Sequence, residues 1–581
     1  MKKLIIIFLL ITSIVFSQNL TEGEKKARRL FSESLKAFYS GKKYDARLKL
    51  EEAMTNQIYL KDVSYFWYFA AKLDLLLGNV EKAKEDLNNI LFFSPSNNEA
   101  ISLLNFINSL NNIGKKIQPQ IKLKEIGRIQ NIINGNEKFY VVNDFVIINS
   151  IAYMLDIEND LIYYTNLDNT LEGWIKLKNI IDEKFIPFNI YYDQRTDYFY
   201  ISGNTGLYVA KNFSQQKVYK FDKINKSSNL LLMALDKIGR FWTYNAKNNS
   251  IYLLDFTGKL VKEIALDDRC IITSGSLSEN NLYLLDIKNK QILIFSLETE
   301  NITKIIPLKN KHMPLQIIAL PYDVFLVTYI EDGVYAYLNN EVIKLFEFPY
   351  LLKYNNGVLM KFDYSKYEMI LDQIEFVSDI IPYYVFIYSI DFDVSNMKIT
   401  LKVNTISPGD NYIDFIDKKI YVTDSEGRYA FNYKKDLKKT QIYRFDNMEY
   451  LFLEMLPLLN NDSVIILNDK ENYNFEKYIS VKNIVPLMFS NISLFVVSDK
   501  TIDESIKSLI HLTRGEIIPE KYYEIFENYI KRNYKVIQSM NYRIFPPIAP
   551  GIRPVKIYLQ TDNKLINDTL YYYSEGVGIA E

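Results

Sequence analysis

The chain has 581 residues, 48% of them hydrophobic, and its 69 basic and 70 acidic residues give a formal net charge of -1. This length predicts several domains, since one hydrophobic core rarely extends so far, and the apolar content argues against disorder. The balanced charge excludes the basic excess typical of nucleic-acid-binding proteins, while a single cysteine and two histidines exclude an internal disulfide and a Cys/His metal cluster.

Residues 1–17 have the form of a secretory signal peptide. Lys2 and Lys3 precede an apolar run from Leu4 to Phe16, and Ser17 closes a small-residue cleavage site. The run is too short to favour a membrane-spanning helix, no cysteine follows it for a lipid anchor, and no later run is long enough to span. The sequence therefore predicts a cleaved, soluble protein of the periplasm. A secreted or cell-surface location and an uncleaved N-terminal anchor remain as alternatives.

Residues 18–117 show apolar side chains at helical spacing, with breaks at Gly41 and Gly78. The segment resembles tetratricopeptide repeats. In the first repeat the resemblance rests on Gly41, Ala46, Leu50 and Ala53, and in the second on Trp67, Gly78, Ala83, Leu87 and Pro95. The resemblance implies a short concave groove that binds peptides or partner proteins. The alternative is that these helices only pack against the propeller predicted next.

Five residues line the groove that this resemblance implies, and we take them as candidate partner-binding residues: Arg28, Phe31, Tyr65, Tyr68 and Lys72. The aromatic rings are expected to bury apolar anchors of a partner, while Arg28 and Lys72 select acidic groups. Trp67, by contrast, is expected to serve packing only.

Residues 118–375 contain five copies of one pattern, an apolar strand, a polar turn and a second apolar strand. Aligned on Tyr163, Tyr208, Tyr252, Leu293 and Tyr335, the copies are 45, 44, 41 and 42 residues apart. A strand-rich repeat of this period predicts a β-propeller. Residues 350–371 supply a sixth blade, closed by a strand from residues 121–129, and six blades are favoured over seven. The stretch from Leu231 to Ile264 resembles an NHL repeat.

Residues 376–581 begin with strands and continue as alternating strands and helices, which predicts a three-layer α/β domain. The order of elements resembles a degenerate von Willebrand factor A domain with two central strands at residues 462–466 and 495–499. That family holds a metal on an Asp-x-Ser-x-Ser motif. Asp393 and Ser395 match its first two ligands, but Met397 replaces the third. We therefore expect no metal and no cofactor.

No Gly-x-Ser-x-Gly elbow and no phosphate-binding Gly-x-x-x-x-Gly-Lys loop occurs in the sequence. The three predicted modules together indicate an exported, non-catalytic interaction or scaffold protein whose partners are other envelope proteins or peptides. Its oligomeric state is left open. One alternative is a propeller enzyme, a lyase or hydrolase that acts on a glycan or small molecule through carboxylates at the channel mouth. Another is a carbohydrate-binding adhesin that uses some of the 46 tyrosines.

Overall fold

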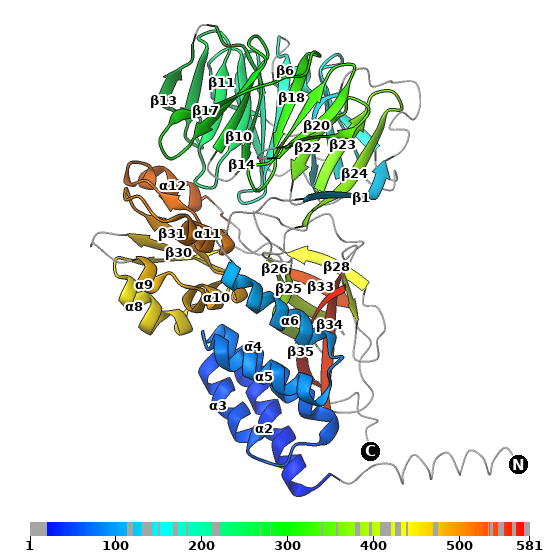
Figure 1. The fold of residues 1–581 in the computed structure, drawn as a ribbon, viewed down its shortest axis with the longest axis vertical. Helices are drawn as coiled ribbons and strands as arrows, with labels where there is room; N and C mark the ends of the chain where they lie inside the picture. The colour runs from blue at the N-terminus through cyan, green and yellow to red at the C-terminus, as the bar shows by residue number, and fades with distance from the viewer. Residues whose placement is uncertain are drawn as a thin grey trace, which may run out of the picture.

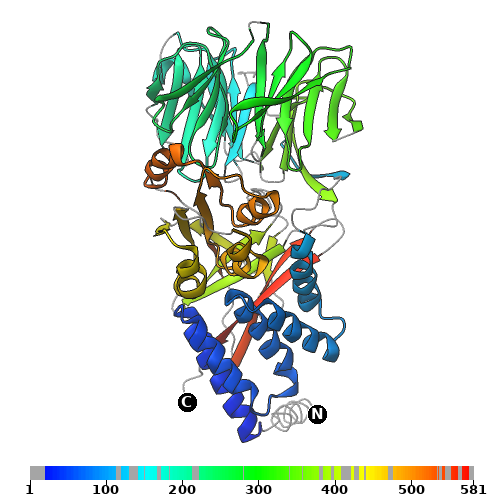
Figure 2. The ribbon, with the colours of Figure 1, turned by 60° about the vertical axis from the view of Figure 1, so that its left-hand side comes forward.

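The computed structural model places three regions in a row along the long axis of the molecule (Figures 1 and 2). A β-propeller forms one end, a bundle of N-terminal helices forms the other, and the C-terminal sheets lie between them. The described residues are 20–574 without 113–119, 130–141, 149–150, 167–171, 182–183, 212–220, 268, 279–280, 339–340, 356–357, 378–383, 394–397, 407–419, 424–430, 437–439, 469–474, 533, 535–538, 544–550 and 561–564.

The propeller consists of six antiparallel sheets of four strands each. Blades 1 to 3 contain β2 (Val142–Ile148), β3 (Ile151–Asp156), β4 (Leu161–Asn166), β5 (Glu172–Lys176), β6 (Pro187–Asp193), β7 (Tyr198–Gly203), β8 (Gly206–Lys211), β9 (Asp222–Asn225), β10 (Leu230–Leu235), β11 (Phe241–Asn245), β12 (Ser250–Leu254) and β13 (Leu260–Ala265). Blades 4 to 6 contain β14 (Ile272–Ser278), β15 (Asn281–Asp286), β16 (Gln291–Ser296), β17 (Asn301–Pro307), β18 (Pro314–Ala319), β19 (Phe325–Tyr329), β20 (Gly333–Leu338), β21 (Glu341–Phe346), β22 (Leu351–Asn355), β23 (Val358–Asp363), β24 (Glu368–Val377) and β1 (Gln120–Ile129). A short helix, α7 (Leu177–Ile180), follows the first blade.

The sixth blade is closed by a strand from the beginning of the propeller segment. Strand β1 pairs antiparallel with β24, with Ile121 opposite Phe376 and Ile129 opposite Met369. The pairing confirms the predicted six blades and the predicted closure. It satisfies the backbone groups along the outer edge of β24, which would otherwise remain unpaired. The five repeats found in the sequence are the second and third strands of blades 1 to 5.

The N-terminal helices form antiparallel pairs. They are α2 (Glu22–Tyr39), α3 (Lys43–Met54), η1 (Leu60–Asp62), α4 (Val63–Leu76), α5 (Val80–Phe93), α6 (Asn98–Ser109) and η2 (Leu110–Asn112). Thr21 and Glu24 form a capping box at the start of α2, which satisfies backbone groups that the helix leaves free. Gly41 and Gly78 adopt φ values of 82° and 81° between paired helices, a conformation that glycine reaches without steric cost.

The C-terminal half contains three sheets instead of one. An antiparallel sheet has the order β25-β26-β33-β28, a second has β27-β34-β35, and a parallel sheet has β29-β30-β31-β32. The strands are β25 (Tyr384–Asp393), β26 (Lys398–Ile406), β27 (Ile420–Thr423), β28 (Phe431–Asp436), β29 (Gln441–Phe445), β30 (Ser463–Asn468), β31 (Ser493–Val497), β32 (Ile517–Ile518), β33 (Ser539–Arg543), β34 (Gly551–Gln560) and β35 (Leu565–Ser574). Because β33 pairs with β26 and β28, the parallel sheet and its helices form an insertion between β28 and β33.

The two faces of the parallel sheet enter different hydrophobic cores, because successive side chains of a strand point to opposite sides. Ile465 and Leu467 pack with α10 and the N-terminal helices, whereas Val464 and Ile466 pack with α12 and the propeller. The helical segments of this region are α8 (Met448–Tyr450), η4 (Leu451–Met455), η5 (Leu456–Leu458), α9 (Phe475–Tyr478), α10 (Val481–Phe489), α11 (Glu504–Leu512), η6 (Glu520–Tyr522) and α12 (Tyr523–Ile530).

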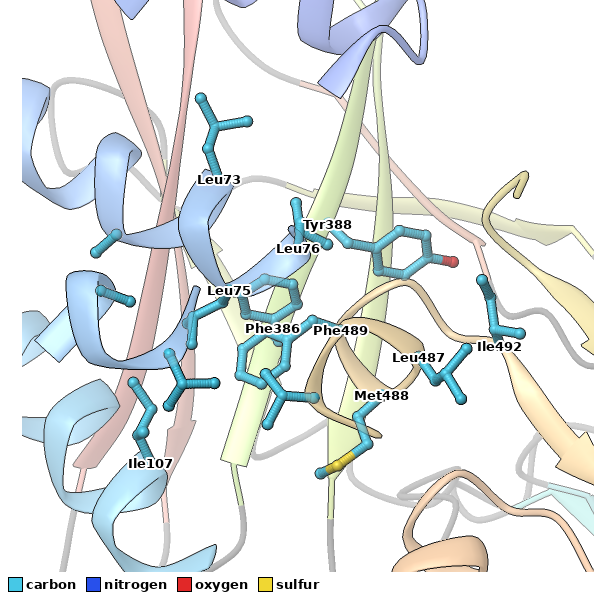
Figure 3. Packing of buried hydrophobic residues seen from close by; sticks show 14 of the residues in the cluster. Leu73, Leu75, Leu76, Ile107, Phe386, Tyr388, Leu487, Met488, Phe489 and Ile492 are labelled. Carbon is cyan, nitrogen blue, oxygen red and sulfur yellow. The ribbon is translucent and has the colours of Figure 1, made fainter. Parts of the chain in front are cut away.

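The N-terminal helices share their core with the C-terminal sheets. Figure 3 shows Leu75 of α4, Phe386 of β25 and Phe489 of α10 meeting in this core. The rings of Phe386 and Phe489 pack edge to face, with centroids 4.1 Å apart. Within the described residues, this core contains no propeller side chain, so packing of the helices on the propeller is not what the structure shows. No helix of the described residues is long and apolar enough to cross a membrane.

Candidate functional site in the propeller channel

Polar side chains gather where the first strands of the blades converge. These first strands contact one another around the ring, β2 with β6, β6 with β10, and onward to β22, which returns to β2. We give the name channel ring to six of the polar side chains of these strands: Asn143, Asp144, Asn189, Ser274, Gln316 and Lys353. They come from five blades that are far apart in the sequence, so only closure of the propeller brings the blades' contributions together.

The neutral members of the channel ring bind the backbone of the next blade. The Gln316 amide donates to the carbonyl oxygen of Leu352 at 2.8 Å and accepts from the same residue's N–H at 2.8 Å. Asn189 donates to the Leu232 carbonyl, and the Ser274 hydroxyl accepts from the next blade's backbone at 3.2 Å. These side-chain polar atoms are bonded to the backbone of the neighbouring blade. We therefore assign the neutral members a role in holding neighbouring blades together.

Asp144 and Lys353 form a charged pair within the ring. The Lys353 ammonium lies 2.8 and 3.0 Å from the two Asp144 carboxylate oxygens and 3.2 Å from the Ile190 carbonyl oxygen. Asp144 also accepts the backbone N–H groups of Phe145 and Ile190, at 2.9 and 3.0 Å. The pair thus joins blades 6, 1 and 2, and its side chains retain 22% exposure at Lys353 and 10% at Asp144.

This pair offers two complementary groups to a small polar molecule. A positioned carboxylate can accept a proton, and an adjacent ammonium can stabilise a negatively charged oxygen as it forms. Because Lys353 is partly exposed, its contact with the Ile190 carbonyl is the one a ligand oxygen can replace with least rearrangement. Lys353 and Asp144 carry no motif in the sequence, so sequence reasoning did not single them out.

The predicted groove residues meet a strand of the same chain. The Lys72 ammonium lies 2.7 Å from an Asp568 carboxylate oxygen of β35 and donates to the carbonyl oxygens of Ile387 and Thr569, at 2.8 and 3.0 Å. The Tyr68 hydroxyl donates to the other Asp568 oxygen at 2.7 Å. Burial lowers the pKa of Lys72, an effect that the Asp568 charge opposes. Burial also raises the pKa of Tyr68.

The remaining groove residues divide into two groups. Phe31 is buried and Tyr65 half-buried, and both rings contact Tyr571 of β35, at centroid distances of 6.2 and 5.0 Å. Arg28 lies apart from them and pairs with Asp62 at 2.6 Å. The expectation of an open groove therefore needs correction, because β35 fills the surface that Phe31, Tyr65, Tyr68 and Lys72 form.

Trp67, expected to serve packing only, is half-buried against the same core. A partial alternation at Val555, Ile557 and Leu559 is a weak signal in the sequence for the hairpin of β34 and β35.

The other residues considered from the sequence lie in separate places. His511 of α11 has its Nδ1 3.1 Å from the Lys237 ammonium of the propeller, whereas His312 lies in a loop before β18. Asp393 ends β25, outside the parallel sheet, and Ser395 and Met397 lie outside the described residues. In the part of the chain that the structure describes, no group of three or more His, Cys, Asp or Glu side chains is placed to hold a metal ion.

No protein-family model and no curated protein matches the chain. Among solved structures, a streptogramin B lyase is 12% identical, covers 44% of this chain and 98% of its own length, and has a TM-score of 0.32. A luciferin-regenerating enzyme is 12% identical, covers 45% of this chain and 96% of its own length, and has a TM-score of 0.33. The WD40 propeller domain of Doa1 is 11% identical, covers 43% of this chain and 97% of its own length, and has a TM-score of 0.29.

These likenesses agree with the propeller fold seen in the structure. The similar propellers named here include enzymes, which contradicts the prediction of a non-catalytic interaction protein and, with it, the prediction that the chain is not an enzyme.

Proposed function

We propose that the chain is a propeller enzyme of the lyase or hydrolase class, acting on a small polar molecule or a glycan at the channel ring. The observation that carries this proposal is the Asp144–Lys353 pair, with N–O distances of 2.8 and 3.0 Å. In this proposal Asp144 accepts a proton from the substrate or from a water molecule. Lys353 stabilises the oxyanion that forms as a carbonyl is attacked or as an adjacent C–H bond is broken.

Substitution of either charged residue is expected to reduce turnover by about 100-fold or more, because general-base and oxyanion-stabilising groups each contribute effects of that size. The variants are Asp144→Asn, which keeps an acceptor for one of the two backbone N–H groups, those of Phe145 and Ile190, that Asp144 binds, and Lys353→Met. Panels of lactones, esters and acidic oligosaccharides are first screened for compounds that raise the melting temperature of the full chain. Turnover of each compound found in this way is then measured with the full chain.

The matched control is Lys361→Met, which removes another lysine of blade 6. Lys361 is paired with Asp372, and both side chains are buried, but neither lies in the channel ring. Its turnover is expected to remain at the level of the unaltered chain. Full turnover in both Asp144→Asn and Lys353→Met would rule out the channel ring as the site. Equal losses in all three variants would indicate general damage to the propeller and would also contradict the proposal.

The outer regions have more specific identities in this proposal. Two antiparallel helix pairs with turns at Gly41 and Gly78 support degenerate tetratricopeptide repeats, whose groove is filled by β35. The parallel order β29-β30-β31-β32 with intervening helices supports a degenerate von Willebrand factor A unit, inserted into the antiparallel sheet. Because Asp393 ends an antiparallel strand instead of a parallel one, no element of this unit supports a metal at that residue. The absence of a bound metal stays a prediction.

Export to the periplasm is a further part of the proposal, supported by the charged start and apolar run of residues 1–17. The mature protein is expected to begin at Gln18 because a signal peptidase would cleave after Ser17. N-terminal sequencing of protein recovered from the periplasm checks this cleavage. A sequence that begins at Met1 would contradict it and would favour the uncleaved anchor.

A further inference from the structure

One end of the propeller points away from the rest of the chain. It holds the loops that enter the first strand of each blade and the turns between the second and third strands. At the opposite end, Gly239 of the β10–β11 turn lies against the ring of Tyr529 of α12, and Glu298 of the β16–β17 turn pairs with Lys507 of α11 at 2.9 Å. Figures 1 and 2 show the C-terminal sheets on that side only. We call the end that points away the free face.

Apolar side chains protrude from the loops and turns of the free face. Ile271 of blade 4, Met313 and Ile330 of blade 5 and Phe348, before blade 6, are between 40% and 66% exposed. The Ile330 N–H donates to the Met313 carbonyl oxygen at 3.0 Å, so the loop and the turn that carry these two side chains are neighbours. Because blades 4 to 6 follow one another around the ring, the four side chains lie along one arc.

Lysines surround this arc and outnumber the acids that could neutralise them. Within the described residues of blades 3 to 6, six exposed lysines of the free face form no ion pair: Lys226, Lys247, Lys288, Lys309, Lys311 and Lys366. The exposed acids there are Asp267, Glu331 and Glu347. Two of them are already paired, Asp267 with Arg269 at 2.8 Å and Glu347 with Lys344 at 2.7 Å. The free face thus carries an excess of positive charge, although the whole chain is close to neutral.

The loop that presents two of these lysines is held in place by its neighbours. The Lys290 ammonium of blade 4 donates to the Lys311 carbonyl oxygen at 2.8 Å. The Asn310 amide donates to the carboxylate of Asp332 in blade 5 at 2.6 Å. The backbone around Lys309 and Lys311 is therefore fixed from both sides. A surface that is ordered beforehand loses less conformational entropy when it binds.

We propose that the free face docks on an anionic lipid surface, with the apolar side chains in the headgroup region and the lysines beside the lipid phosphates. Aliphatic side chains surrounded by lysines are typical of surfaces that bind lipid interfaces. Protein–protein interfaces, by contrast, are depleted in lysine and enriched in arginine, tyrosine and tryptophan. The docking does not depend on catalysis at the channel ring.

Co-sedimentation of the full chain with lipid vesicles tests the docking. Vesicles of equal parts phosphatidylcholine and phosphatidylglycerol are compared with vesicles of phosphatidylcholine alone. Binding to the anionic vesicles is expected to be tighter by about tenfold or more and to weaken as salt is added, because salt screens exposed charges. Equal binding to both kinds of vesicle, or no binding to either, would overturn the proposal.

Two sets of substitutions assign the binding to the free face. The combination of Lys288→Gln, Lys309→Gln and Lys311→Gln is expected to weaken binding to anionic vesicles by about 100-fold, since each lysine near such a surface contributes about fivefold. Met313→Ser with Ile330→Ser is expected to weaken it by about tenfold or more, because less apolar surface leaves water. An unchanged melting temperature shows that each variant is still folded.

The controls change the same residue types on the N-terminal helices, at the other end of the molecule (Figure 1). Lys26→Gln, Lys36→Gln and Lys42→Gln together remove three exposed lysines. Leu48→Ser with Phe92→Ser removes side chains that are 65% and 81% exposed. Both controls are expected to bind as the unaltered chain does. Since all variants keep residues 1–17 or lose them alike, that segment affects them equally. Full binding by both sets of free-face variants, or equal losses in the controls, would refute docking through the free face.

Discussion

Replacement of Lys72 by methionine is expected to destabilise the attachment of the N-terminal helices to the C-terminal sheets by about 3–5 kcal/mol, the usual effect of removing one partner of a buried ion pair. Lys72 is 2% exposed and Asp568 is fully buried, so the remaining carboxylate would lie in the core without a counter-charge. The Tyr68 hydroxyl and the Ile387 N–H would still donate to Asp568, which keeps the loss below that of an isolated charge.

A double substitution distinguishes a lost ion pair from a packing defect. Lys72→Met combined with Asp568→Asn removes both charges, keeps an amide oxygen as an acceptor for one of the two buried donors, and is expected to recover part of the lost stability. Urea denaturation measures the free energy of unfolding of both variants. Hydrogen exchange of the α4 amides measures how firmly the N-terminal helices stay attached. The control is Lys84→Met, which breaks a surface pair with Glu81 and is expected to change stability by less than about 1 kcal/mol. If Lys72→Met alone proved as stable as Lys84→Met, the prediction would be refuted.

Substitution of Gly239 by alanine is expected to separate α12 from the propeller and to destabilise that contact by about 3 kcal/mol. Gly239 lies in the turn between β10 and β11 with φ of 83°, so a Cβ atom there costs about 1–2 kcal/mol in backbone strain. The same Cβ would also lie well inside van der Waals contact of the Tyr529 ring, which adds about 1–3 kcal/mol for overpacking. Tyr529 is fully buried, and its hydroxyl donates to Asp193 of the propeller at 2.6 Å.

Gly41→Ala provides the matched control for this effect. Gly41 has φ of 82°, but among the described residues no atom beyond its two chain neighbours lies within 4 Å of the position that its Cβ would take. It therefore reports the backbone strain alone, about 1–2 kcal/mol. Faster hydrogen exchange in α12 for Gly239→Ala, compared with the unaltered chain, measures the separation. Equal destabilisation by the two substitutions would show that the clash with the Tyr529 ring adds nothing to the loss of stability caused by Gly239→Ala.

The propeller was predictable from the sequence because its signals are local. Two-residue alternation and a period of 41 to 45 residues mark each blade independently of the others. Closure by β1 followed from the same reasoning, since Ile121 to Ile129 alternates as an outer strand does. The two strands expected at residues 462–466 and 495–499 overlap β30 and β31.

Other elements escaped prediction for identifiable reasons. Helix α10 contains Pro486 and a continuous apolar run, features that obscure a helical pattern. Strand β33 pairs with β26 and β28, which precede it by more than 100 residues across the inserted α/β unit, and such pairings leave no local trace. The hairpin of β34 and β35 carries Pro554 and several charges, which obscure its alternation.

The charged pairs were the least predictable feature. Asp144 and Lys353 are 209 residues apart and meet only because the ring closes, and Lys72 and Asp568 are 496 residues apart. A lysine on a helix is normally assigned to the surface, because charged side chains are rarely buried without a partner. The sequence shows Lys72 at a groove position but contains nothing that identifies Asp568 as its partner.

The distance in sequence between Lys72 and Asp568 has a consequence for the order in which the protein is made. A ribosome releases α2 and α4 almost 500 residues before β35 exists, so the nascent helices present Phe31, Tyr68 and Lys72 without the strand that covers them. Exposed apolar surface of this kind promotes aggregation in incomplete chains. The N-terminal helices thus acquire their full stability only after β35 has been synthesised, and a chain that stops before β35 is expected to require a chaperone throughout its life.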